Sequence, residues 1–190
     1  MTYDAEKRDI SIAVVGDAMI SRRMQSFREP HFLKLVDILR KADVSIANLE
    51  FLFHDYESTW QWTSSTYTRS DPRNLNELKW MGIDVALTAN NHSFDFSEGG
   101  FLTTLGHLND VDLLHAGGGI DLDHARAPVY VDAARGRVAV MSASASYTEL
   151  SRAGPGRPDF KVMVREGDWK YIYLANGGRE LLFNLVDDPN

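Results

Sequence analysis

The first half of the chain alternates short apolar runs with segments whose apolar residues recur at helical spacing. The run ISIAVVG, residues 10–16, has the length and β-branched content of a strand. In the segment that follows it, Phe32, Leu35 and Leu39 recur every three or four residues, as on one face of a helix. Further strands are predicted at residues 44–49, 84–89 and 112–117, and helices at residues 31–42, 74–82 and 99–109. This alternation predicts an α/β fold with a mostly parallel sheet flanked by helices.

The second half of the chain has a different pattern, rich in β-forming residues. Residues 127–132 and 137–144 are two such runs joined by AARG, which predicts an antiparallel hairpin and the start of an incomplete second sheet. Glycine and proline crowd residues 151–159, so a linker is expected there. Beyond it, residues 161–174 predict a C-terminal β-hairpin, followed by one short strand. We therefore expect two parts, residues 1–159 and residues 160–190.

The amino-acid composition argues against several classes of function. The chain has 190 residues, no cysteine, and 27 acidic against 20 basic residues, for a formal charge of -7. This charge disfavours a nucleic-acid partner and favours a cation, and the lack of cysteine excludes thiolate metal sites and thiol nucleophiles. Neither a signal-peptide pattern nor an apolar segment of about 18 residues is present. We expect a cytoplasmic protein without a membrane span.

Uncommon polar residues follow the predicted strands at equivalent points. Asp17 follows the first strand, Asn48 and Glu50 end the second, and the sequence Asn90-Asn91-His92 ends the third. The carboxyl ends of neighbouring parallel strands share one edge of a sheet, where ligands bind, so these side chains are expected to converge. Carboxylates, amide oxygens and an imidazole suit Mn, Fe, Zn or Mg. A bound metal lowers the pKa of water, and His92 could move the proton.

Structural roles compete with this interpretation. Asn and Asp favour turns after strands because their side chains bond to nearby backbone, and Asp17 could simply cap the next helix. Glu50 lacks such a role, since NLEFLF surrounds it with apolar residues that would penalise a lone charge. The glycines of HAGGGI do not lead into a helix as a phosphate-binding loop does. An aromatic group, STWQWTSSTYT, could line a substrate groove or pack as a surface loop.

Several ordered motifs resemble those of the bacterial CapA family. These are VVGDAMISRR, ADVSIANLE, MGIDVALTANNHSFDFSEGGFLTTLGHLN, AGGGIDLDHARAP and GRVAVMSAS. The CapA family comprises capsule proteins of poly-gamma-glutamate synthesis that have the fold of calcineurin-like metallophosphatases. The resemblance implies a metal site with Asp17, Glu50 and Asn91 as ligands and His92 as the catalytic histidine. Three further residues would support that site: Asn48, Asn90 and Asp95.

The chain departs from the CapA pattern after about residue 159. It lacks the later histidine-bearing motifs, of the H-x-G and G-H-x-P-H kind, that complete the family's metal site. Residues 160–190 instead resemble the C-terminal segment of the sulfatase family, with K-Y followed by E-L-x-x-L-x-x-D-P. Sulfatase activity is not expected, because the required C/S-x-P-x-R motif is absent.

Three hypotheses follow from the resemblance and the departure. The first is a metal-dependent phosphoesterase-type protein linked to poly-gamma-glutamate capsule synthesis, which acts on a small-molecule or polymer substrate. The second is a non-catalytic remnant or binding module whose metal site is vestigial. The third is a sulfatase-related fragment without a nucleophile. The sequence does not define the substrate or the oligomeric state.

Overall fold

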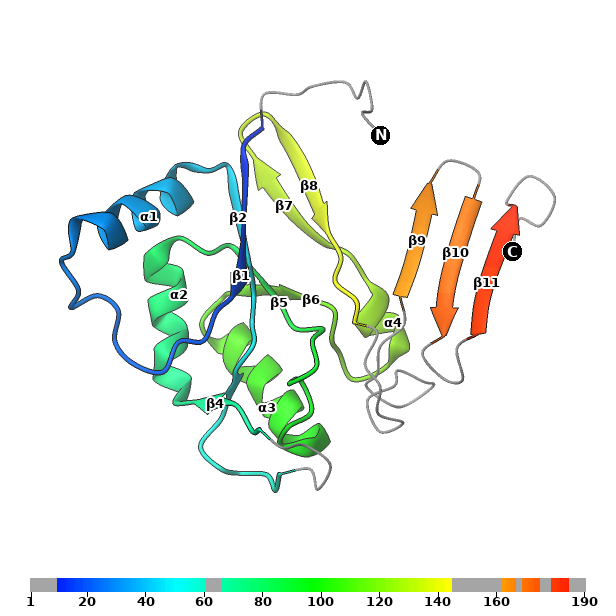
Figure 1. Ribbon diagram of the computed structural model, residues 1–190, viewed down its shortest axis with the longest axis horizontal. Helices are drawn as coiled ribbons and strands as arrows, with labels where there is room; N and C mark the ends of the chain where they lie inside the picture. The colour runs from blue at the N-terminus through cyan, green and yellow to red at the C-terminus, as the bar shows by residue number, and fades with distance from the viewer. Residues whose placement is uncertain (1–9, 61–65, 145–161, 167–168, 175–178, 185–190) are drawn as a thin grey trace.

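A four-stranded parallel sheet organises the first part of the chain in the computed structural model (Figure 1). The structure describes residues 10–60 and 66–144 in full, and the backbone of three C-terminal strands. The sheet has the order β1-β2-β5-β6 and is parallel throughout. Its strands are β1 (Ile12–Asp17), β2 (Val44–Asn48), β5 (Val85–Leu87) and β6 (Leu114–Ala116). This confirms the predicted α/β class and places the ends of β1, β2 and β5 along one edge.

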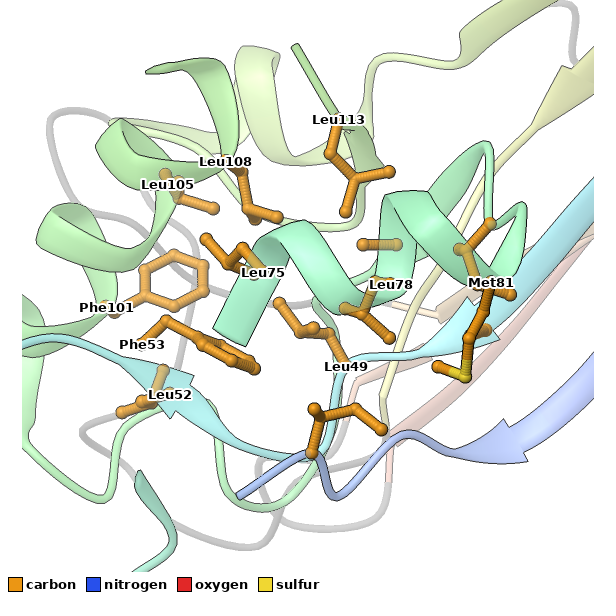
Figure 2. Packing of buried hydrophobic residues seen from close by; sticks show 14 of the residues in the cluster. Leu49, Leu52, Phe53, Leu75, Leu78, Met81, Phe101, Leu105, Leu108 and Leu113 are labelled. Atoms are coloured by element: carbon orange, nitrogen blue, oxygen red, sulfur yellow. The ribbon is translucent and has the colours of Figure 1, made fainter. Parts of the chain in front are cut away.

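Helices cover one face of this sheet and enclose the larger apolar core. They are α1 (Pro30–Lys41), α2 (Leu75–Met81) and α3 (Ser97–Asp110), with the 3-10 turn η1 (Pro72–Asn74) leading into α2. Figure 2 shows Leu75 and Leu78 of α2 packed among side chains from α3 and from the segment after β2. Gly82 ends α2 with a φ of 92°, a left-handed conformation that glycine adopts without strain.

The opposite face of the sheet packs against the predicted antiparallel hairpin. This hairpin consists of β7 (Val129–Ala133) and β8 (Gly136–Val140). Val44, Ile46 and Val85 of the sheet are buried in a second, smaller apolar cluster that includes Val140 of β8. Side chains alternate between faces along a strand, so β2 contributes Ala47 to the helix side and Ile46 to the hairpin side. The hairpin therefore covers the middle of the second face, whereas Ile12 and Val14 of the edge strand β1 remain exposed.

Besides η1, three short elements were not predicted from the sequence. The two-residue strands β3 (Leu52–Phe53) and β4 (Arg69–Ser70) pair in parallel, and α4 (Leu122–Arg126) follows β6. Asp121 caps α4 by accepting a hydrogen bond from the backbone N–H of His124. The β3–β4 pair matters most for function, because it holds the chain beside the edge where β2 and β5 end.

The C-terminal part contains an antiparallel sheet of its own. Its strands, in the order β11-β10-β9, are β9 (Val162–Glu166), β10 (Trp169–Leu174) and β11 (Arg179–Asn184). The predicted C-terminal hairpin and last strand are therefore present. The expected linker at residues 151–159 and the expected boundary at residue 159 lie outside the described residues. No helix in the described part of the chain is long and apolar enough to cross a bilayer.

Candidate metal and catalytic site

Asp17 lies at the carboxyl end of β1, opposite Asn48 of β2. The register between these strands shifts at Gly16, and this irregularity brings Asp17 into line with Asn48. Asp17 is exposed. It does not cap the next helix, because α1 begins after Glu29 without a side-chain cap. The carboxylate is thus available to a ligand at the edge of the sheet.

Asn48 joins two carboxylates through one amide group. Its Nδ2 atom donates to Asp17 Oδ1 at 2.8 Å and to Glu50 Oε2 at 2.7 Å. Both amide protons are used, so the two acids are held close together with a neutral donor between them. The Oδ1 atom of Asn48 accepts from Asn90 Nδ2 at 3.1 Å, which links β2 to the loop after β5.

The loop at residues 88–95 is shaped by its own polar side chains. Asn90 Oδ1 accepts a hydrogen bond from the backbone N–H of His92 at 2.9 Å, which is the turn chemistry expected of an asparagine after a strand. The hydroxyl of Ser93 lies 2.5 Å from the carbonyl oxygen of Thr88 and accepts from the N–H of Asn90 at 3.0 Å. Ser93 is buried, and these bonds fix the loop so that His92 faces the end of β2.

His92 lies between two carboxylates. Its Nδ1 atom is 2.8 Å from Asp95 Oδ2, and its Nε2 atom is 3.4 Å from Glu50 Oε1. The imidazole side chain is 18% exposed, so it contacts both acids without being sealed from solvent. Because Asp95 accepts a hydrogen bond at Nδ1, the tautomer protonated at Nδ1 is favoured. The Nε2 atom then faces Glu50.

Asp95 is almost fully buried, and three donors converge on one of its oxygens. Besides His92 Nδ1, the backbone N–H of Thr68 donates to Oδ2 at 2.7 Å, and the hydroxyl of Thr68 lies 3.1 Å from the same atom. The Thr68 hydroxyl is also 3.1 Å from the carbonyl oxygen of Glu50. A buried carboxylate requires such donors, because water cannot solvate it.

The structure therefore brings together most of the predicted site residues. They form one continuous hydrogen-bonded cluster: Asp17, Asn48, Glu50, Asn90, His92 and Asp95. Asn91, the third predicted ligand, is exposed and its side chain makes no hydrogen bond to the described residues. Within the described ranges, no group of three or more His, Asp or Glu side chains is close enough to hold a metal ion.

The donor types nevertheless fit a hard or borderline divalent cation. Two carboxylates on adjacent strand ends, with amide oxygens and an imidazole beside them, match the ligand preferences of Mn, Zn or Mg. The Asn48 amide now occupies one oxygen of each carboxylate. A cation bound by Asp17 and Glu50 would compete with that amide for the same oxygens.

Other polar features flagged by the sequence have structural explanations. Gly118 of HAGGGI packs against Phe101, and a Cβ atom at this position would lie 2.2 Å from its ring. Gly118 is therefore needed for the close approach of the segment after β6 to α3. In the aromatic segment, Tyr67 packs edge-on to Phe96 and Trp60 is 60% exposed, whereas Trp62 lies outside the described residues.

Sequence reasoning missed two residues of the cluster, Thr68 and Ser93. Ser93 could have been found, since serine hydroxyls also bond to nearby backbone in turns. Thr68 had no local signal, because it lies 27 residues from Asp95 along the chain and meets it only through the β3–β4 pair.

Comparison with known proteins agrees with the resemblance in the motifs. Residues 11–171 match the model of the family described as bacterial capsule synthesis protein PGA_cap. Two proteins of Sinorhizobium fredii (strain NBRC 101917 / NGR234), named Uncharacterized protein y4sH and Uncharacterized protein y4uA, are each 35% identical over 166 residues. The match covers 82% of this chain but 36% of each relative, so the chain spans about a third of their length. The chain belongs to the bacterial capsule synthesis protein family PGA_cap, which is the CapA family.

Proposed function

We propose that the chain is a metal-dependent phosphoesterase-type protein that acts in poly-gamma-glutamate capsule synthesis. The observation that carries the proposal is the junction of Asp17, Glu50 and His92 at the ends of three strands, linked through Asn48. Family membership supports a role in capsule synthesis. The phosphoesterase chemistry is our inference from the cluster and from the metallophosphatase resemblance.

In this proposal, Asp17 and Glu50 hold the cation, and Asn91 is a predicted further ligand. A divalent cation at this place would supply Lewis acidity toward a phosphoryl oxygen and toward water. Asp17 is exposed, so a substrate can reach this edge of the sheet from solvent.

His92 moves a proton at Nε2, the ring atom that faces Glu50. Asp95 accepts the Nδ1 proton, which fixes both the tautomer and the plane of the ring. In a neutral ring held this way, Nε2 carries the lone pair that can accept a proton from an attacking group. A positioned acid or base of this kind accelerates a reaction by about 10²–10⁴-fold.

One observation favours a second candidate, a non-catalytic module of the same family. The two amide protons of Asn48 already satisfy Asp17 and Glu50 without a cation. In that case the polar cluster would serve to join the strand ends, and the chain would act through its surfaces.

Calorimetric titration with Mn²⁺ and with Zn²⁺ separates the two candidates. The metal-dependent function requires saturable uptake by the wild-type chain and loss of that uptake in Asp17→Ala and Glu50→Ala. Asp43→Asn is the matched control, because Asp43 precedes β2 and bonds to Ser11 at the other end of the sheet. Uptake that survives in both alanine variants, or no uptake at all, favours the non-catalytic module.

A further inference from the structure

We propose that Thr68 is a positioning residue that fixes the His92–Asp95 pair in its reactive geometry. The expected effect of Thr68 on catalysis rests on the proposed function, whereas its effect on the His92 tautomer can be measured separately. Thr68 immediately precedes β4 and lies beside the loop that carries His92 and Asp95.

Thr68 reaches two parts of the site at once. Its N–H donates to Asp95 Oδ2 at 2.7 Å, and its hydroxyl oxygen is 3.1 Å from both Asp95 Oδ2 and the Glu50 carbonyl oxygen. A hydroxyl has one proton, so it donates to one of these acceptors at a time. In either case the backbone N–H of Thr68 holds Asp95, and the hydroxyl adds a bond either to Asp95 or to the Glu50 carbonyl oxygen that follows β2.

The orientation of Asp95 determines the orientation of His92. Asp95 is 2% exposed, and the atom that receives both Thr68 contacts is the one that bonds His92 Nδ1. A carboxylate can rotate about its last bond, and fixed donors on one oxygen prevent that rotation. Thr68 thereby directs Oδ2 toward Nδ1 and Nε2 toward Glu50.

Thr68 acts through Asp95, because the hydrogen bonds that it donates within the described structure go to Asp95 and to the Glu50 carbonyl oxygen, and not to Asp17 or to the His92 ring. Loss of its hydroxyl should therefore lower kcat while KM stays unchanged. The hydroxyl that is lost lies 3.1 Å from a charged, buried acceptor, Asp95 Oδ2, so a fall of about ten-fold in kcat is expected.

The test compares three variants by nitrogen NMR of the His92 ring and by hydrolysis of bis-p-nitrophenyl phosphate with added Mn²⁺. Thr68→Val removes the hydroxyl and keeps the N–H donor, and Thr68→Ser restores the hydroxyl. Thr104→Val is the matched control: Thr104 is buried on α3 and bonds only to backbone of Phe53 and Gly100 in the described structure.

The expected result is a wild-type ring protonated at Nδ1, with the Nε2-protonated form gaining population in Thr68→Val alone. Thr68→Ser and Thr104→Val should keep the wild-type tautomer and a kcat within about two-fold of wild type, because neither loses a donor to Asp95. A Thr68→Val ring identical to that of Thr104→Val overturns the proposal. If the wild type does not hydrolyse the ester, the proposed function fails, and the tautomer comparison alone decides the role of Thr68.

Discussion

His92 and His54 both follow a strand near the same edge of the molecule, yet their surroundings differ. Both ring nitrogens of His92 face carboxylates, and its side chain is 18% exposed. His54 is fully buried, packs edge-on to Phe96 at 4.3 Å, and accepts a hydrogen bond from the N–H of Tyr56 at Nδ1. Among the described residues, its Nε2 has no hydrogen-bond partner. A histidine needs both a close partner and access to solvent in order to transfer protons. His54 has Glu57 at 3.6 Å but no access, so of these two rings His92 alone combines both.

The largest expected effect is the loss of activity on removing the His92 ring. His92→Ala should lower the rate of phosphodiester hydrolysis by about 10²–10⁴-fold, because no other imidazole among the described residues bonds to this cluster. Its free energy of unfolding should fall by about 1–3 kcal/mol, because the buried Asp95 carboxylate loses one of its donors. Rates are measured with bis-p-nitrophenyl phosphate, and unfolding is measured in urea. An equal loss of activity in His54→Ala would contradict the distinction between the two histidines.

Removal of the His54 ring should affect stability and not catalysis. His54→Ala leaves a cavity beneath Phe96, and the free energy of unfolding should fall by about 2 kcal/mol, a value reduced by the loss of an unpartnered buried nitrogen. Urea unfolding gives this value, and activity per folded molecule should remain at the wild-type level. His31→Ala is the control, because His31 is exposed on α1, and its effect should be within about 0.5 kcal/mol.

The smallest effect concerns pH. Burial, aided by the nearby Arg69 guanidinium, lowers the pKa of His54 below its ordinary value, and burial does the same to the pKa of His115. The unfolded chain then binds a proton on each histidine before the folded chain does. The free energy of unfolding is therefore highest above about pH 6.5 and decreases as the pH falls below that value. His54→Gln should flatten this decline in thermal unfolding, and a profile that superimposes on the wild type would contradict the assignment.

The sequence predicted the sheet and helices because their patterns are long enough to show a period. Val44 to Leu49 and the Phe32–Leu39 face are such segments, and β2 and α1 lie where they were expected. The strands β3 and β4 have two residues each, too few for any alternation to appear. Their pairing depends on distant contacts, which a local pattern does not record.

The same distinction holds for the candidate site. The predicted strand ends put Asp17, Asn48, Glu50 and His92 at one edge, where the structure also has them. Parallel strands run in the same direction, so their carboxyl ends share one edge of the sheet. The direction of each side chain is set by local turns, and Asn91 consequently lies exposed beside a clustered His92. The contact between Thr68 and Asp95 depends on the β3–β4 pair, so no local sequence pattern predicted it.

The most direct test of the central claim is anomalous X-ray scattering from crystals grown with Mn²⁺. The proposal predicts one manganese peak that contacts a carboxylate oxygen of Asp17 and one of Glu50, at about 2.2 Å as is typical of metal–carboxylate bonds. The amide of Asn48 should then have left at least one of these oxygens. A peak elsewhere, such as at the exposed Asp121–His124 pair, or no peak beside Asp17 and Glu50, would contradict it.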